Sequence, residues 1–241
     1  MFKKVFICFF TLILMKLKKE GKSCFIYLFR HGQTYYNKEG IFTGWKESRL
    51  TPLGIKQART IAKKLKNKQI DLAYQTKLSR SRDTLKEVLK FHSECRKIIT
   101  DNRMIERNYG KLNGMKHEQF IKNIGDKMYN LLKEGDAIVS LSPSMRKRVE
   151  KFLGEEEYKL IHRGYNIPPI GGESFAMVEK RVKPFIQDLI GKIKKDRVNV
   201  AISAHGNSIR LFRKIMEHSS VEQMTKWFIP YDKVFVYKIR C

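Results

Sequence analysis

Residues 24–37 read CFIYLFRHGQTYYN, and this stretch decides how the rest of the chain is interpreted. Residues 24–29 form a short apolar run, which predicts a buried strand. Arg30, His31 and Gly32 follow where that strand runs out into a loop. In open α/β sheets, ligands bind beyond the carboxyl ends of the strands. The stretch therefore places an arginine and a histidine where a ligand would bind.

A second predicted strand ends in the same way. The run 197–203 is followed by His205, Gly206 and Asn207, which open a helix predicted over 207–217. Parallel strands would bring both histidines to one edge of a sheet, and the backbone N–H groups of a helix N-terminus attract anions. A single histidine at a strand end is usually structural. Two His-Gly pairs, one with an adjacent arginine, are hard to explain by packing alone.

Strands and helices alternate along most of the chain. Strands are predicted over 24–29, 71–75, 96–100, 197–203 and 233–239. Helices are predicted over 51–67, 78–91, 172–195 and 207–217. In the first helix Thr51 is a suitable N-cap and an apolar stripe runs over Leu53, Ile55, Ala58, Ile61, Ala62 and Leu65. The alternation predicts an α/β fold with a mostly parallel central sheet flanked by helices.

The segment from about 118 to 160 interrupts this alternation. It is rich in charge and offers no strand pattern, so it predicts a helical insertion or cap, packed over one edge of the sheet. The expected organisation is therefore one catalytic domain over 24–241 that contains this insertion. Residues 1–23 form an N-terminal extension outside it.

The N-terminal extension begins MFKKVFICFFTLILM. Its apolar run, 5–15, is shorter than the roughly 20 residues that span a bilayer, and no small-x-small cleavage site follows it. Three interpretations remain, in order of preference: a true start at Met15, an uncleaved membrane anchor, and a cleaved signal peptide. Membrane association is expected only if the segment is real and retained.

Composition limits the partners. The 241 residues include 50 Lys and Arg against 24 Asp and Glu, a formal charge of +26, which attracts anions. The lysines are scattered and form no long basic block, so specific binding of nucleic acid is not expected. Cys8, Cys24, Cys95 and Cys241 show neither zinc-ligand spacing nor a disulfide framework, and their wide spacing fits a reducing compartment. A cytoplasmic location is therefore expected.

The chemistry that fits the two strand ends is covalent phosphoryl transfer. A neutral imidazole attacks phosphorus, and fixed cations and N–H donors stabilise the charge on the oxygens around it. Arg30 is poorly suited to a buried strand unless an anion pairs with it. Such a site consists of arginine, histidine and backbone donors, so no metal is expected.

Seven segments of the chain resemble the histidine phosphatase superfamily, which contains the cofactor-dependent phosphoglycerate mutases. They are RHGQTYYNKEGIFTGW (30–45), LTPLGIKQA (50–58), YQTKLSRSRDTL (74–85), MIERNYGKLNG (104–114), GGESFAMVEKRV (171–182), AISAHGNSIR (201–210) and FIPYDKVFVYKI (228–239). The resemblance covers most of residues 24–239 and implies a phosphoglycerate mutase-like fold.

The resemblance implies a role for each matching residue. His31 would be the nucleophile, Arg30, Arg80 and His205 would clamp the transferred phosphoryl group, and Glu106 would be the general acid and base. Alone, Arg80 could be a solvated helix charge and Glu106 a loop carboxylate paired with Arg103 or Arg107; the motifs favour the functional reading. The implied substrate-binding residues are Thr34, Asn37, Thr43, Gly44, Arg107, Tyr109, His117, His162, Arg163, Gly206 and Asn207.

Three features depart from the mutase pattern. His117 and His162 stand where mutases carry Lys and Arg, while Arg163 is kept, and the alignment implies about thirty inserted residues near 124–153. A histidine has a reference pKa of about 6.5, which a bound phosphate would raise, so substrate binding is expected to weaken above neutral pH. The chain also ends at Cys241, without the C-terminal tail of longer mutases, which suggests a more open site that admits water.

The resemblance implies a mutase that interconverts 3-phosphoglycerate and 2-phosphoglycerate through phosphohistidine, primed by 2,3-bisphosphoglycerate, in glycolysis and gluconeogenesis. The alternative is a phosphatase of the same fold that hydrolyses a small phosphomonoester. A non-catalytic, basic nucleic-acid-binding module is disfavoured because His31, His205 and Arg30 are all present. The expected partner is a small phosphorylated substrate, and a homodimer is left open.

Overall fold

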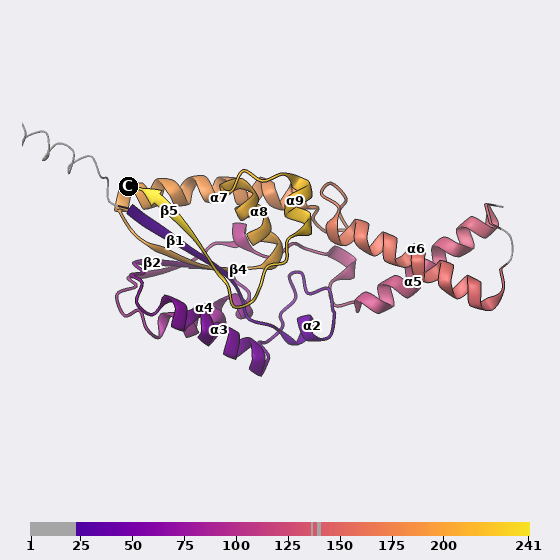
Figure 1. Cartoon of the computed structure of the whole chain (residues 1–241), viewed down its shortest axis with the longest axis horizontal. Helices are drawn as coiled ribbons and strands as arrows, with labels where there is room; N and C mark the ends of the chain where they lie inside the picture. The colour runs from indigo at the N-terminus through magenta and orange to yellow at the C-terminus, as the bar shows by residue number, and fades with distance from the viewer. Residues whose placement is uncertain (1–22, 136, 139–140) are drawn as a thin grey trace, which may run out of the picture.

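The computed structural model describes residues 23–135, 137–138 and 141–241, and a five-stranded sheet lies at its centre (Figure 1). The strands are β1 (Ser23–Arg30), β2 (Leu72–Gln75), β3 (Lys97–Thr100), β4 (Val200–Ala204) and β5 (Val234–Arg240). Their spatial order is β3-β2-β4-β1-β5, and only the pairing of β5 with β1 is antiparallel among these described strands. The predicted α/β class with a mostly parallel sheet is confirmed.

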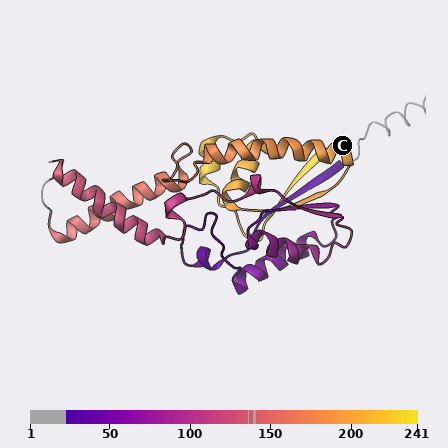
Figure 2. The ribbon, with the colours of Figure 1, turned by 180° about the vertical axis from the view of Figure 1, so that it is seen from behind.

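Helices cover both faces of this sheet. On one face lie α3 (Pro52–Leu65) and α4 (Ser79–Leu89); on the other lie α7 (Phe175–Asp196) and α8 (Gly206–Met216), as Figures 1 and 2 show. Strand β1 contributes side chains to the hydrophobic cores on both faces of the sheet. Its Ile26 and Leu28 pack with the α7 and α8 side, while Tyr27 and Phe29 pack with the α3 and α4 side. Burial on both faces explains the continuous apolar run of this strand.

The predicted helix at 51–67 is close to α3, but its apolar stripe is narrower than expected. Thr51 caps the helix, and its Oγ1 accepts a hydrogen bond from Gly54 N at 3.0 Å. Ala58, Ile61, Ala62 and Leu65 are buried. Leu53 remains 49% exposed, because at 100° per residue it points away from the face formed by Ala58, Ala62 and Leu65. Two short helices were not predicted: α2 (Tyr35–Lys38) and α9 (Val221–Lys226).

The inserted segment folds as two helices, α5 (His117–Glu134) and α6 (Pro143–Arg163), that form an antiparallel hairpin. Their backbones touch at two glycines. A Cβ on Gly125 or on Gly154 would stand 2.0 Å from a carbonyl oxygen of the facing helix, so only glycine fits. The expected packing over a sheet edge is wrong. The hairpin instead projects from the end of the body at which the parallel strands finish (Figures 1 and 2).

The base of this hairpin is anchored by a small apolar cluster of its own. Phe120 and Ile161 from the hairpin pack there with Phe42 and Tyr109 from two loops of the body. This cluster is separate from the two cores of the sheet. The insertion is therefore attached beside the carboxyl ends of the strands, where ligands bind in such folds.

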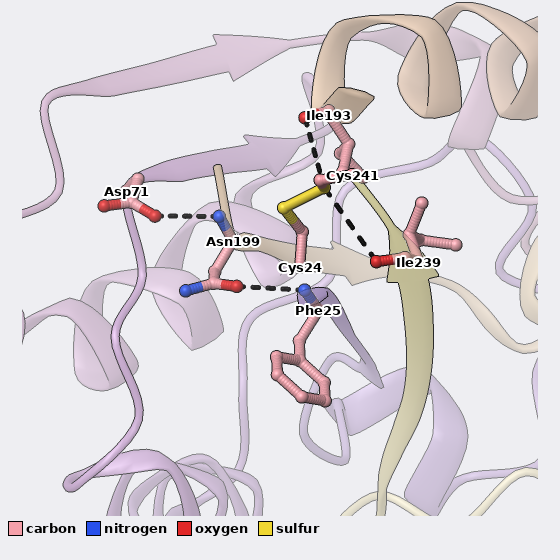
Figure 3. The surroundings of a disulfide bond; sticks show 7 residues. All are labelled: Cys24, Phe25, Asp71, Ile193, Asn199, Ile239 and Cys241. Carbon is pink, nitrogen blue, oxygen red and sulfur yellow. Dashed lines mark hydrogen bonds between the residues drawn. A yellow bond between two sulfur atoms is a disulfide. The ribbon is translucent and has the colours of Figure 1, made fainter. Parts of the chain in front are cut away.

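A disulfide joins Cys24 to Cys241, with the two Cα atoms 6.2 Å apart (Figure 3). The expectation of no disulfide is wrong for this pair, since antiparallel β5 returns along β1 and pairs Ile239 with Cys24. The cysteines therefore no longer indicate a reducing compartment. Beside the bond, the Asn199 side chain accepts a hydrogen bond from Phe25 N at 2.9 Å.

The interpretations of the N-terminal segment, residues 1–22, fall outside the described residues. Within the described ranges, every helix is too short or too polar to cross a bilayer.

Candidate active site

The ends of β1 and β4 bring His31 and His205 together. Arg30 pairs in register with Ala204, and His31 N donates a hydrogen bond to Ala204 O at 3.0 Å. The centroids of the two imidazole rings lie 5.0 Å apart. The parallel pairing of two strands that each end in histidine thus builds the centre of the site.

His31 is held as a neutral imidazole with one free nitrogen. Its Nδ1 lies 2.7 Å from the carbonyl oxygen of Gly32, and a carbonyl can only accept, so Nδ1 carries the proton. The Nε2 lone pair is then available. Burial, together with the charges of Arg80 and Arg30, lowers the pKa of His31 well below its ordinary value. The ring is therefore a neutral imidazole at neutral pH, protonated on Nδ1 and free at Nε2, as a nucleophile requires.

His205 is fully buried behind His31 at the N-terminus of α8. Its Nε2 lies 2.8 Å from Thr76 Oγ1. Its Nδ1 is buried without a hydrogen-bond partner among the described residues. Burial, with the charge of Arg80, lowers its pKa well below the ordinary value. A buried nitrogen without a partner at a helix N-terminus is a feature that a bound group would satisfy.

Two arginines stand beside His31. Arg80 is buried, and its Nη1 and Nη2 donate to Lys46 O at 2.8 Å and to Gly44 O at 2.7 Å. The reading of Arg80 as a solvated helix charge is therefore wrong. Burial lowers its pKa to about 10, so it stays charged at neutral pH. Arg30 donates from Nη1 to Ile229 O at 3.0 Å, and its guanidinium lies 4.0 Å from the Tyr231 ring centroid.

Glu106 faces the same cavity and is positioned by backbone donors. Its Oε1 accepts hydrogen bonds from Arg107 N at 2.8 Å and Asn207 N at 3.2 Å. Arg103 is committed elsewhere, because it pairs with Asp101 and Asp188. The interpretation of Glu106 as a loop carboxylate paired with Arg103 is therefore wrong.

The loop that carries Glu106 is braced from three directions. The carbonyl oxygen of Glu106 accepts from Trp45 Nε1 at 2.7 Å and from Arg181 Nη2 at 3.0 Å. Glu173 Oε2 accepts from Asn108 N at 2.9 Å and also from Arg181. Trp45 belongs to the FTGW segment and Glu173 to the GGES segment. Both segments therefore help to fix the position of the Glu106 carboxylate.

The cavity that these groups enclose has a volume of about 230 Å³ and is strongly positive. Among the described residues, its charged lining consists of four arginines and one carboxylate: Arg30, Arg80, Arg163, Arg210 and Glu106. Arg30 Nε and Arg163 Nη1 are buried without hydrogen-bond partners in the described structure. This excess of cationic donors would bind an anion of small volume, such as a phosphate ester.

Most of the predicted site residues line this cavity. They are Arg30, His31, Asn37, Thr43, Gly44, Arg80, Glu106, Tyr109, His117, His162, Arg163, Gly206 and Asn207. Three do not. His205 lies behind His31, and Thr34 caps α2 through Asn37 N. Arg107 is buried between the rings of Tyr109 and Phe175, and its Nη2 donates to Ile161 O.

His117 and His162 come from the base of the hairpin and sit among aromatic rings. His162 stacks on Tyr158 with centroids 5.0 Å apart, and His117 Nδ1 lies 3.2 Å from Tyr158 Oη. Burial lowers the pKa of His117, and burial with the charge of Arg163 lowers that of His162 to about 2. Both shifts favour the neutral ring in the free protein, and the expectation that a bound phosphate raises these pKa values stays a prediction.

Arg210 is a site residue that the sequence analysis missed. Its Nη1 donates to Asn207 Oδ1 at 2.7 Å and its Nε to Trp227 O at 3.0 Å. Burial, with the charge of Arg163, lowers its pKa to about 9. The signal was available: Arg210 lies three residues after Asn207, which places both on one face of α8. Tyr36, Phe228 and Tyr231 also line the cavity and were missed.

No group of three or more His, Cys, Asp or Glu side chains is arranged to hold a metal ion in the part of the chain that the structure describes. The donors around the cavity are guanidinium, imidazole and backbone N–H groups, which suit an anion.

The fold and the site together define a class: an α/β protein with a histidine-centred site suited to phosphoryl transfer. Residues 26–155 and 144–240 match the model of the histidine phosphatase superfamily (branch 1), and the chain belongs to this superfamily.

Similar proteins carry two kinds of name. A relative from Parvibaculum lavamentivorans, named 2,3-bisphosphoglycerate-dependent phosphoglycerate mutase, is 33% identical over 216 residues, covering 88% of this chain and 89% of the relative. The crystal structure of phosphoglycerate mutase from Bacillus anthracis superposes with a TM-score of 0.65 at 22% identity, over 92% and 91% of the chains. The alpha-ribazole phosphatase from Shigella flexneri gives 0.63 at 20% identity, over 88% and 89%. At these identities the two structures show the fold alone.

Proposed function

We propose that this protein is a 2,3-bisphosphoglycerate-dependent phosphoglycerate mutase, which interconverts 3-phosphoglycerate and 2-phosphoglycerate. The observation that carries the proposal is the cavity itself, in which Glu106 and the neutral imidazole of His31 both face a space lined by four guanidinium groups. A nucleophile, a proton carrier and two pairs of cations are what a substrate with one phosphate and one carboxylate needs. The name of the relative at 33% identity supports the same choice.

In the proposed mechanism, the bound primer 2,3-bisphosphoglycerate supplies the phosphoryl group that His31 carries. His31 Nε2 forms the N–P bond as the P–O bond of the ester breaks, and Glu106 gives its proton to the leaving oxygen. Arg30, Arg80 and the Gly206 N–H stabilise the charge on the transferred group. Glu106 then takes the proton of the other substrate hydroxyl, whose oxygen attacks phosphorus and releases His31.

The outer cations bind the part of the substrate that does not react. Arg163 and Arg210 line the cavity on the side of the hairpin and α8, and Arg163 Nη1 is buried without a partner in the described structure. We assign the substrate carboxylate and the second phosphate of the primer to these two guanidinium groups, because bidentate Arg pairs suit both anions.

The test is a steady-state assay of 3-phosphoglycerate conversion with and without added 2,3-bisphosphoglycerate, beside an assay of inorganic phosphate. We expect conversion that depends on the primer, an acid-labile phosphoenzyme, and little phosphate release. EDTA should leave the rate unchanged, because no step requires a metal. Brisk phosphate release without conversion would contradict the mutase assignment.

A phosphatase acting on a small phosphomonoester is the second candidate, and the neutrality of His117 and His162 favours it. Lys and Arg at these positions would hold a second anionic group on the substrate. With two neutral rings there, the outer end of the cavity binds such a group less tightly, and water can replace the second hydroxyl as the acceptor. The same assay separates the two candidates. A cytoplasmic location also belongs to the proposal, since it follows from the proposed glycolytic role.

A further inference from the structure

Helix α6 carries an apolar stripe that faces away from α5. Met145, Phe152 and Leu160 are 44%, 60% and 49% exposed. Their spacing of seven and eight residues places them on one face of the helix. Gly154, two residues beyond Phe152 and so on the opposite face, touches the backbone of α5. One face of α6 therefore packs on α5, and the opposite, apolar face is exposed to solvent.

The charges along α6 change sign at Phe152. The basic residues Arg146, Lys147, Arg148 and Lys151 precede it, and the acidic residues Glu155, Glu156 and Glu157 follow it. Lys159 and Arg163 are the basic exceptions after Phe152, and Lys159 pairs with Glu156 on the same helix. Glu150 is the exception before Phe152, and its Oε1 is taken by Arg146 Nε of the same helix at 2.5 Å. Glu155–Glu157 are the only consecutive acidic residues in the whole sequence. A helix that is basic in one half and acidic in the other complements its own reversed copy.

We propose that α6 binds α6 of a second copy of this chain, antiparallel, about a two-fold axis near Phe152. The apolar stripe is nearly symmetric about this residue, so Met145 would lie against Leu160 of the second copy and the two Phe152 rings would meet at the axis. Arg148 would lie beside Glu155 of the second copy, because the two positions are four and three residues from the centre. A two-fold contact of this kind uses one patch twice.

The shape of the molecule permits this pairing. Figures 1 and 2 show the hairpin projecting from the body, so that most of α6 lies clear of the body and only its C-terminal end adjoins it. Pro143 begins α6 at the far end of the hairpin and Arg163 ends it beside the cavity. Antiparallel pairing therefore places the two catalytic bodies at opposite ends of the helix pair, where they do not collide.

The contact should be weak. A helix of 21 residues is about 31 Å long and presents three exposed apolar side chains, so the total buried area stays below the roughly 1,200 Å² of a stable interface. The formal charge of +26 on each copy also opposes association at long range, while Glu155 and its neighbours reduce that repulsion locally. We expect a dimer with a dissociation constant in the micromolar range.

The first experiment is sedimentation velocity on the full chain, from about 1 to 200 μM, a range that brackets a micromolar equilibrium. A monomer–dimer equilibrium should appear, and Phe152→Glu should weaken it at least about tenfold by placing two carboxylates at the axis. Phe91→Glu is the matched control, because Phe91 is 46% exposed on the catalytic body. A chain that stays monomeric throughout, or a dimer that Phe152→Glu leaves unchanged, would overturn the proposal.

The second experiment exchanges the charges. Arg148→Glu and Glu155→Arg should each weaken the homodimer, since each sets like charges against each other at both ends of the contact. An equimolar mixture of the two variants should associate as the wild type does, because a mixed pair regains both opposite-charge contacts. A mixture no tighter than either variant alone would reject the antiparallel register. None of these residues lines the cavity, so phosphoenzyme formation checks that each variant is folded.

Discussion

The inner and outer walls of the cavity are held in different ways. The inner wall, Arg30, His31, Arg80 and Glu106, is fixed by hydrogen bonds to backbone atoms at the ends of the strands and in braced loops. The outer wall, His117, His162 and Arg163, comes from the base of the hairpin and rests mainly on ring packing around Phe42 and Tyr158.

This difference separates two tasks. Reacting groups must be held within a few tenths of an ångström of the productive geometry, and strand ends provide that rigidity. Groups that select the rest of the substrate can sit on an insertion. Changes to the inner wall should therefore alter the rate of the chemical step, while changes to the outer wall should alter substrate affinity.

The largest effect should come from His31→Ala. We expect a loss of activity on the order of 10⁴-fold or more and no acid-labile phosphoenzyme, because the other imidazoles that line the cavity, His117 and His162, lie on its outer wall among aromatic rings. A radiolabelled primer followed by acid lability of the bound label is the measurement. His218→Asn is the control, since His218 is exposed and adopts a left-handed backbone conformation that asparagine tolerates. Label retained on His31→Ala would contradict the assignment.

His205→Ala should reduce kcat by about 10²–10³-fold, the usual loss for one donor to a developing charge. The KM should change little, since the unpartnered Nδ1 of His205 would contact the transferred group and not the rest of the substrate. Single-turnover kinetics of phosphoenzyme formation measures the step directly. Near wild-type rates would make His205 a purely structural residue of the inner wall.

Arg210→Lys sharpens the comparison, since Arg210 reaches both walls. The lysine keeps the charge but loses the fork that binds Asn207 and Trp227 O together. We expect KM for 3-phosphoglycerate to rise about tenfold, the effect of one lost charged hydrogen bond, with a smaller change in kcat. A fall in kcat with unchanged KM would instead assign Arg210 to the support of Glu106.

The pH dependence of the free energy of unfolding tests whether His162, on the outer wall, is buried. The pKa of His162 is lowered to about 2, so below pH 6.5 the unfolded chain binds a proton that the folded chain does not. Stability is therefore lost as the pH falls below 6.5. Between pH 7.5 and 5.5 His162→Gln should lose about 1.4 kcal/mol less than the wild type. Urea unfolding at both pH values provides the comparison, and equal losses would place His162 in contact with water.

The smallest expected effect is the change in KM for 3-phosphoglycerate as the pH rises. Since His117 and His162 are already neutral, raising the pH from 7 to 8 removes no charge from these two rings, and Arg210, whose pKa burial lowers to about 9, stays mostly charged. The KM for 3-phosphoglycerate should stay within about twofold, in contrast to the alkaline rise that the sequence suggested. A steep rise in KM above pH 7 would show that bound substrate raises the pKa of one of these rings.

The inner wall was predictable because its signals are local. Each strand ends in its histidine within a few residues, and parallel pairing is the default for alternating strands and helices, so the sequence alone predicts that His31 and His205 lie together. Arg210 was not predicted, because an arginine on a helix is usually solvated, although its spacing from Asn207 places both residues on one face of α8.

The disulfide, the direction of the hairpin and the neutral state of His162 depend on contacts between residues far apart in the sequence. Cys24 and Cys241 are 217 residues apart in sequence, and only the antiparallel return of β5 brings them together. The direction of the hairpin depends on Gly125 and Gly154 touching the facing backbone, which no sequence period reveals. The neutrality of His162 follows from burial beside Arg163, and a residue's surroundings cannot be deduced from its identity.

The pairing of Ser23 with Arg240, beside the disulfide, makes the described chain nearly circular. A short peptide linker across this junction would let the order of the segments be permuted. New ends opened between α5 and α6 would lie at the tip of the hairpin, far from the junction and from the strand ends (Figure 1). The catalytic body could then be expressed starting at α6 and finishing with α5, so that the two hairpin helices become separate terminal arms.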